Sequence, residues 1–166
     1  MTKTQLFFSL LFVLVVFTVS NQIISAQTLP AKVKSHLNDN YSGWKLFSGA
    51  RVCNSRAVVS GNFNGDGRND YAVMFKKGRN GYVVAFLSSG TDYKAHLLET
   101  RSSSEMQGVF LSVARKGTTY GEIIDENFNR RNRKLQFDAP EGGNCEASSY
   151  FWIYSNGKFR QAFTSD

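Results

Sequence analysis

Short apolar segments separated by turn-forming residues run through most of the chain and constrain its fold class. They occupy residues 44–47, 57–59, 71–75, 82–87, 93–99 and 109–114, with weaker candidates at 120–124 and 134–137. Residues 149–154 and 159–163 flank Asn156-Gly157, a dipeptide that favours a two-residue type I′ hairpin turn. Segment 82–87 is apolar throughout, which is typical of a strand covered on both faces. This pattern predicts a mainly antiparallel β-sheet.

One segment near the N-terminus has helical periodicity instead. Between Thr28 and Asn40, the apolar residues Leu29, Val33 and Leu37 recur at intervals of four, which places them on one face of a helix. We therefore predict an α+β fold in which an N-terminal helix packs on a mainly antiparallel β-sheet.

The first 26 residues resemble a secretory signal peptide. Lys3 provides a positive charge, residues 6–19 are almost continuously apolar, and Ala26 is a small residue suited to cleavage before Gln27. A membrane anchor is the alternative, but polar residues at 20–22 make the apolar run short for a membrane span. We predict a secreted or periplasmic protein whose residues 27–166 form a single domain, monomeric and without a membrane span after cleavage.

The chain contains two cysteines, Cys53 and Cys145. An even number of cysteines in an exported protein predicts a disulfide. Two buried free thiols are the alternative, and a redox pair is disfavoured because the spacing is not C-x-x-C.

The stretch GNFNGDGRNDYAVMF has the residue order of a calcium-binding loop. Asn62, Asn64, Asp66 and Asp70 stand at relative positions one, three, five and nine, and Arg68 at position seven would contribute its backbone carbonyl. Calcium takes roughly six to eight oxygen ligands, and a loop supplies several only when it bends sharply, which the intervening glycines allow. Position twelve is not the glutamate of an EF-hand. Residues 62–70 are therefore predicted to bind calcium between two strands, although a turn without metal would also suit these residue types.

This loop resembles those of FG-GAP/VCBS-type repeats, which are also found in integrin α-subunit propellers. Their pattern is approximately D-x-[DN]-x-D-G-x-x-D followed by an apolar strand. The resemblance implies that Asn62, Asn64, Asp66, Asp70 and the carbonyl of Arg68 are calcium ligands. It covers one copy of the loop, so it implies a loop and not a propeller fold. Asn62 stands where the pattern has Asp, and with fewer negative charges we expect a dissociation constant on the order of 10⁻⁴–10⁻³ M.

Familiar catalytic motifs are missing from the sequence. It contains no nucleophile elbow, zinc-protease motif, P-loop or dinucleotide-binding motif, and His36 and His96 stand far apart. Glycosidase chemistry needs only two suitably placed carboxylates. Candidates for such a pair are Asp125, Glu126, Asp138, Glu141 and Glu146.

Basic and aromatic clusters have ordinary interpretations. The formal net charge is +7, but the basic residues are scattered, which is typical of a solvated surface and does not indicate a nucleic-acid partner. The densest basic run, residues 130–134, is expected to be a solvated loop neutralised by the acids just before it, or alternatively a grip for a phosphate or an acidic protein. The aromatic residues at 150–152 and 154 could form a sugar platform, but we expect them in the core.

These observations favour binding over catalysis. We predict an exported, calcium-stabilised binding domain whose partner is an envelope glycan or a protein, including the case of an inhibitor of a hydrolase. The alternative is a secreted hydrolase that uses loop carboxylates on a polysaccharide or a phosphate ester.

Overall fold

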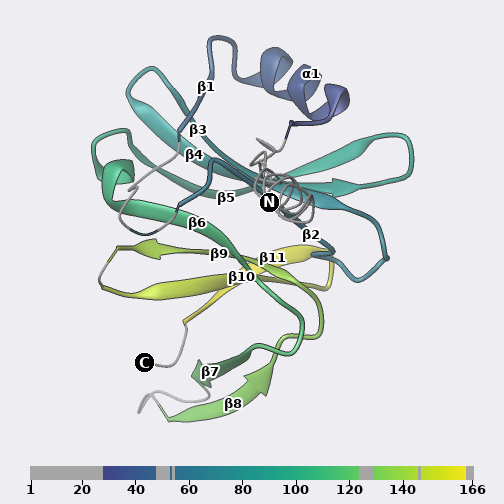
Figure 1. Ribbon diagram of the computed structural model, residues 1–166, viewed down its shortest axis with the longest axis vertical. Helices are drawn as coiled ribbons and strands as arrows, with labels where there is room; N and C mark the ends of the chain where they lie inside the picture. Colours follow the sequence, from purple (N-terminus) through teal and green to yellow (C-terminus); the bar gives the residue numbers. More distant parts are fainter. Residues whose placement is uncertain (1–27, 48–52, 54, 124–128, 146, 164–166) are drawn as a thin grey trace, which may run out of the picture.

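The described residues form two packed antiparallel sheets, a separate β-hairpin and one α-helix (Figure 1). The computed structural model describes residues 28–47, 53, 55–123, 129–145 and 147–163, so the predicted signal peptide lies outside it. The elements are α1 (Ala31–Asn40), β1 (Lys45–Leu46), β2 (Val58–Gly61), β3 (Asp70–Lys77), β4 (Asn80–Ser88), β5 (Tyr93–Ser102), the short 3₁₀ helix η2 (Glu105–Gly108), β6 (Val109–Ala114), β7 (Thr119–Ile123), β8 (Arg130–Lys134), β9 (Ala139–Asn144), β10 (Ser149–Ser155) and β11 (Lys158–Phe163).

Helix α1 covers one face of the first sheet, which has the order β1-β3-β4-β5 with β2 also paired to β3 (Figure 1). The predicted apolar face of the helix is confirmed, because Leu29, Val33 and Leu37 are all buried. They pack against alternate residues of the central strands, including Phe75 and Phe86. No helix in the described residues is long and apolar enough to cross a membrane.

The second sheet, in the order β11-β10-β9-β6, packs on the opposite face of the first. The residues of β3 and β4 that point away from the helix, such as Met74 and Val83, join Leu111, Tyr150 and Trp152 in this core. The aromatic run is therefore a core element, as expected. The predicted hairpin is also confirmed, since β10 and β11 pair across Asn156 and Gly157, both of which have positive φ.

The prediction of one sheet under a helix has to be corrected. The central strands are apolar on both faces, but a ten-residue helix covers only one of them. A second sheet covers the other face, which makes the protein a mainly antiparallel β structure with one short N-terminal helix. Strands β7 and β8 pair with each other and form a third, two-stranded sheet.

The strand boundaries near residue 135 also differ from those expected. The basic run 130–134 forms strand β8 and not a loop, and of the predicted strand 134–137 only Lys134 belongs to a strand. Strand β9, with the sequence APEGGN, was not predicted because its glycines and proline disfavour strands. The absence of a side chain at Gly142 has a physical reason, since a Cβ there would lie 2.4 Å from the Trp152 ring.

Covalent and main-chain links join the two sheets along one side. The predicted disulfide between Cys53 and Cys145 is present, with Cα atoms 5.8 Å apart, and it is consistent with an oxidising compartment. Just after Cys53, the amide of Arg56 donates to the carbonyl of Leu111 in β6. The carbonyl of the following residue, Ala57, accepts a hydrogen bond from the amide of Met74 in β3. Two consecutive residues, Arg56 and Ala57, are therefore hydrogen-bonded to different sheets, the first to the second sheet and the next to the first sheet.

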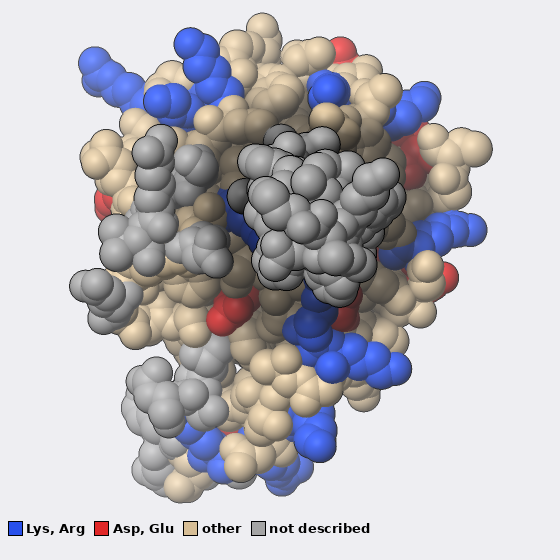
Figure 2. Space-filling model, in the orientation of Figure 1, with Lys and Arg blue, Asp and Glu red and all other residues tan. Residues whose placement is uncertain are grey.

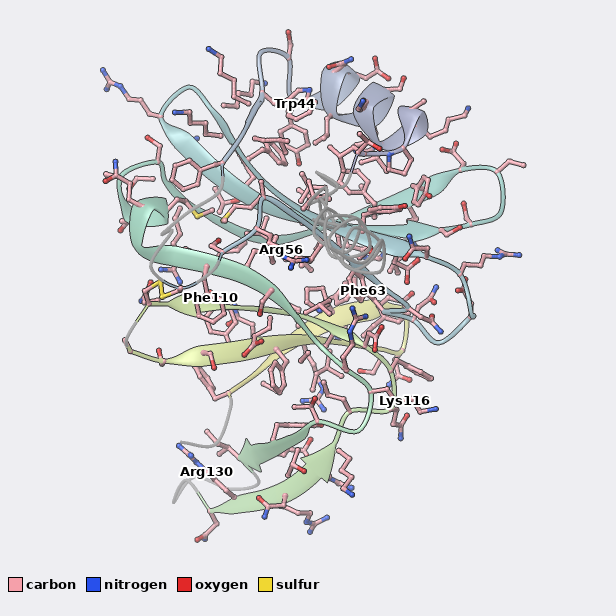
Figure 3. All side chains as sticks on the ribbon, viewed as in Figure 1. Trp44, Arg56, Phe63, Phe110, Lys116 and Arg130 are labelled. Carbon is pink, nitrogen blue, oxygen red and sulfur yellow. A yellow bond between two sulfur atoms is a disulfide. The ribbon has the colours of Figure 1, made fainter. Side chains whose placement is uncertain are left out.

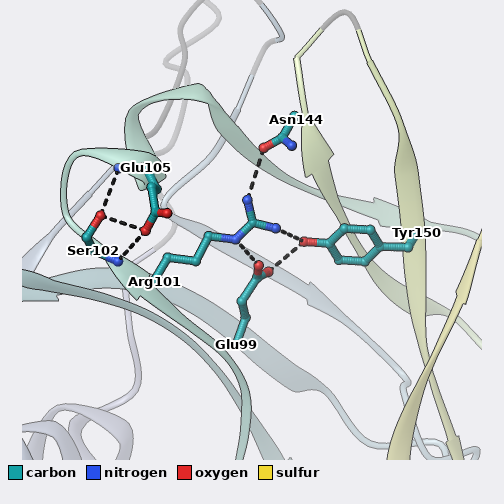
Figure 4. Close-up of polar contacts among 6 residues, drawn as sticks. All are labelled: Glu99, Arg101, Ser102, Glu105, Asn144 and Tyr150. Carbon is teal, nitrogen blue, oxygen red and sulfur yellow. Dashed lines mark hydrogen bonds and ion pairs between the residues drawn. The ribbon is translucent and has the colours of Figure 1, made fainter.

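A polar cluster joins the sheets at a second place (Figure 4). The Tyr150 hydroxyl in β10 donates to the Glu99 carboxylate in β5 at 2.6 Å and accepts from Arg101 at 3.2 Å. Arg101 also pairs with Glu99 and donates to Asn144 at 3.1 Å. Burial, followed by the hydrogen bond to Glu99, raises the pKa of Tyr150. The hydroxyl is therefore held as a proton donor to the carboxylate.

Replacing Tyr150 with phenylalanine should lower the free energy of unfolding by about 1–2 kcal/mol, because Glu99 loses a donor in a partly buried position. Denaturant unfolding followed by tryptophan fluorescence measures this change. Tyr154→Phe, on the same strand, is the matched control, since that hydroxyl makes no hydrogen bond within the described residues. Equal stability of the two variants would contradict the inter-sheet role of the cluster.

Candidate functional site

The calcium-type loop connects β2 to β3, which confirms that it lies between two strands. The side-chain oxygens of its first three candidate ligands accept hydrogen bonds from backbone N–H groups further along the loop. These bonds run from Gly65 to Asn62 (2.9 Å), from Asp66 to Asn64 (3.0 Å) and from Arg68 to Asp66 (2.8 Å). The bonds to Asn64 and Asp66 are the Asx turns expected of Asn and Asp in tight loops, and the bond to Asn62 spans one residue more. They hold the three oxygens against the loop backbone.

Asp70 is the buried member of the predicted ligand set, with no exposed surface. Its two carboxylate oxygens accept the amides of Phe63 and Ser88, each at 2.8 Å, and so tie the loop to the end of β4. Burial raises the pKa of Asp70, the amide donors oppose this, and the nearby charge of Asp66 raises the pKa further. The two carboxylates of the loop are thus close enough to repel each other.

These features suit a hard cation. The donor set contains only oxygen, as calcium prefers, and a buried carboxylate is costly unless a positive charge or a metal compensates it. Within the described residues no Lys or Arg forms an ion pair with Asp66 or Asp70. Nor do the described residues contain a group of three or more His, Cys, Asp or Glu side chains able to hold a metal. A metal in this loop would therefore depend on the amide oxygens and the Arg68 carbonyl as well as the carboxylates.

The loop packs directly against the segment that leads into β9. A Cβ atom on Gly65 would lie 2.2 Å from the ring of Phe137, so only glycine allows this contact. The amide of Asn62 donates to the carboxylate of Asp138 at 3.3 Å. The loop thereby supports residues 137 and 138.

The same two residues line a cavity of about 360 Å³. This pocket lies between the loop, the β7–β8 hairpin and the strands β10 and β11, and its volume is within the range of small-ligand sites. Apolar and aromatic groups line one part of it, and charged groups line the other. The apolar lining comprises Phe63, Leu135, Phe137, Ala139, Ile153 and Tyr154. Figure 3 shows Phe63 between the two sheets, and Arg130 marks the start of β8 in the hairpin below them.

Two arginines and a glutamate form the charged part of the pocket. The Glu122 carboxylate accepts from Nε of Arg133 at 2.8 Å and from a terminal nitrogen of Arg160 at 3.2 Å. The same nitrogen of Arg160 lies 3.5 Å from the Tyr120 hydroxyl. Three strands, β7, β8 and β11, therefore meet at this carboxylate.

Both carboxyl groups in the pocket are held ionised. The hydrogen bond from Arg133 and the charges of the neighbouring arginines lower the pKa of Glu122. At Asp138, burial opposes ionisation, but the amides of Lys116 and Asn62 and the guanidinium of Arg115 outweigh it and lower its pKa. A glycosidase also needs a carboxylic acid that stays protonated. Neither of these two groups suits that role.

Sequence reasoning found part of this site. The loop and the basic run 130–134 were recognised, but Tyr120, Glu122 and Arg160 were not, because only the fold brings β7 and β11 to β8. Of the candidate carboxylates, Asp125, Glu126 and Glu146 lie outside the described residues. Glu141 accepts a hydrogen bond from Ser112 at 2.7 Å, away from the pocket.

Neither histidine is placed as a catalytic base. His96 packs edge-on against the neighbouring rings of Tyr154 and Phe159, and burial lowers the pKa of His96. His36 lies on helix α1, and its ring contacts Phe86 of β4 edge-on.

Comparison with protein-family models, with curated proteins and with solved structures gives no significant match. The resemblance of the loop to FG-GAP/VCBS-type repeats therefore depends on its own residues.

Substituting alanine at Gly65 should destabilise the protein more than the same change at Gly67. Both glycines have φ near +80°, but a Cβ on Gly67 meets no atom within 4 Å. We expect about 1 kcal/mol for Gly67→Ala, from backbone strain alone. For Gly65→Ala we expect about 2–4 kcal/mol, because Phe137 must also move. Denaturant unfolding of both variants measures the difference, and equal losses would contradict the packing of Phe137 on the loop.

Proposed function

We propose that this protein is an exported, calcium-stabilised binding domain that receives its partner in the pocket between the β2–β3 loop and the β7–β8 hairpin. The observation that carries the proposal is the shared wall between the two features. Phe137 packs on Gly65, Asp138 accepts from Asn62, and both residues line the pocket. Any ion that stiffens the loop therefore also stiffens one side of the pocket.

In this proposal the calcium ion offsets the repulsion between Asp66 and Asp70 and joins the loop oxygens. Asn62, Asn64, Asp66, Asp70 and the carbonyl of Arg68 would hold it. The chain itself supplies the rest of the support through the amides of Phe63 and Ser88. The role of the ion is structural, and the pocket residues make the contacts with the partner.

Binding is favoured over hydrolysis by the state of the pocket carboxylates. Glu122 and Asp138 are stabilised as anions by arginine and amide donors, whereas a hydrolase acting on polysaccharide through paired carboxylates needs one of them protonated. An envelope glycan or a protein, including a hydrolase that the domain inhibits, is the partner class consistent with export. Export itself is supported by the signal-like residues 1–26 and by the disulfide.

Calcium should raise the melting temperature of residues 27–166 by a few degrees at several times its dissociation constant. Asp66→Ala should remove this shift, because it deletes one of the two loop charges without disturbing the buried Asp70. Differential scanning calorimetry with and without calcium, followed by addition of a chelator, measures the effect. Asp39→Ala, an exposed change on the helix, is the control and should retain the shift. A shift of equal size in wild type and Asp66→Ala would mean that the ion binds elsewhere. If the melting temperature does not change up to several millimolar calcium, the loop is a turn that binds no calcium.

A bulky residue placed in the pocket should abolish partner binding. Ser155 lines the pocket, whereas Gln161 on the neighbouring strand is exposed and does not. Retention of purified envelope polysaccharide and of envelope proteins on the immobilised domain should fall at least about tenfold for Ser155→Trp, since the new side chain fills the space that a partner needs. Gln161→Trp should bind as the wild type does. Retention unaffected by Ser155→Trp would contradict the assignment of the pocket, and hydrolysis of the polysaccharide that Asp138→Asn abolishes in a folded protein would support the hydrolase alternative.

A further inference from the structure

We infer that the pocket recognises a carboxylate-bearing sugar of an acidic polysaccharide. This inference rests on the proposed binding function and names the chemistry of the ligand.

Among the described residues that line the pocket, positive charge exceeds negative charge at the charged end. Arg131, Arg133 and Arg160 all act on the Glu122 carboxylate. Strand β8 carries four basic residues among its five, all of them exposed. Figure 2 shows Lys and Arg side chains at the lower end of the molecule, where Figure 1 places β7 and β8, and also along its upper and right-hand edges. An anionic group is therefore attracted to this end.

The arginines retain donors for a second carboxylate. Each guanidinium has five N–H donors in a planar fork that matches a carboxylate. The bonds to Glu122 and Tyr120 use Nε of Arg133 and one terminal nitrogen of Arg160. Arg133 and Arg160 are 49% and 42% exposed, so their other nitrogens are accessible to a ligand. Two half-exposed guanidinium groups already fixed by Glu122 lose little freedom when they bind.

Other groups in the same pocket suit a saccharide. The carboxylate of Glu122 accepts hydrogen bonds and would bind sugar hydroxyl groups, and the Tyr120 hydroxyl lies next to it. Aromatic and apolar residues such as Phe137, Ile153 and Tyr154 offer surface to the C–H face of a sugar ring. The pocket thus combines anion donors, hydroxyl acceptors and an apolar wall within a volume suited to one or two sugar rings.

A nucleic acid fits this arrangement less well. Nucleic-acid binding depends on many phosphate contacts along a basic surface. Here the basic groups border a small pocket, which has room for one or two sugar rings but not for a long row of phosphate contacts.

Titration calorimetry with a galacturonic acid tetrasaccharide tests the inference, using its fully methyl-esterified form as the neutral comparison. The intact calcium-loaded domain should bind the acid form at least about tenfold more tightly than the ester, because charge-assisted hydrogen bonds are lost on esterification. Arg133→Gln combined with Arg160→Gln should remove this preference. Lys32→Gln combined with Lys34→Gln removes the same charge from helix α1 and should leave the preference intact. Arg160→Lys, which retains charge but loses the fork, should weaken binding of the acid form by a smaller factor.

Several outcomes would overturn the inference. Equal binding of the acid and the ester would show that the pocket does not recognise the carboxylate of the sugar. Binding of neither form would exclude this ligand class. Equal losses in the β8–β11 and helix double variants would mean that only net charge matters. Binding of a thymidine oligonucleotide with the same sensitivity to Arg133 and Arg160 would favour a general polyanion site. The proposed binding function is judged separately by the Ser155→Trp experiment with envelope polysaccharide and proteins, so its success or failure is distinguishable from that of the acidic-sugar inference.

Discussion

The apolar character of both faces of β3 and β4 is the constraint on which the rest of the structure depends. Alternate residues of these strands enter two different cores, with Phe75 and Phe86 beneath the helix and Met74 and Val83 against the second sheet. Such strands cannot remain solvated on either side. Helix α1 covers one face of β3 and β4, and the second sheet covers the other.

The start of β3 brings this constraint to the candidate site. Asp70 is the first residue of the strand and is fully buried, so its charge must be met by amide donors from the loop and from the end of β4. That requirement fixes the loop against the sheet, and the loop in turn fixes Phe137 and Asp138. The buried carboxylate of Asp70 thus positions one wall of the pocket through the loop that it anchors.

Much of the fold could be predicted from local pattern, whereas the site required tertiary structure. The helix face at Val33 and Leu37, the strand 109–114 and the Asn156-Gly157 turn follow from periodicity and turn chemistry. Strand β9 is not predicted because its glycines make room for tertiary neighbours, Gly142 for the Trp152 ring and Gly143 for the backbone of Ser148, and no local pattern reveals these contacts. The pocket was missed for a related reason, since Glu122, Arg133 and Arg160 come from three strands whose pairing order is not encoded in their spacing. The fold shows that the basic run at 130–134 pairs with the strand that carries Glu122, and that Arg133 of this run binds the Glu122 carboxylate.

The β7–β8 hairpin has a consequence for the energetics of the molecule. Within the described residues its strands pair only with each other, and it contacts the rest of the molecule through Tyr120, Leu135 and the ion pair between Glu122 and Arg160. Elements with few buried contacts open at lower free energy than the core sheets. We therefore expect amide hydrogens of the hairpin to exchange faster than those of β3 and β4. A molecule seated against the hairpin would slow that exchange, and part of its binding enthalpy would be offset by the entropy lost in ordering these two strands.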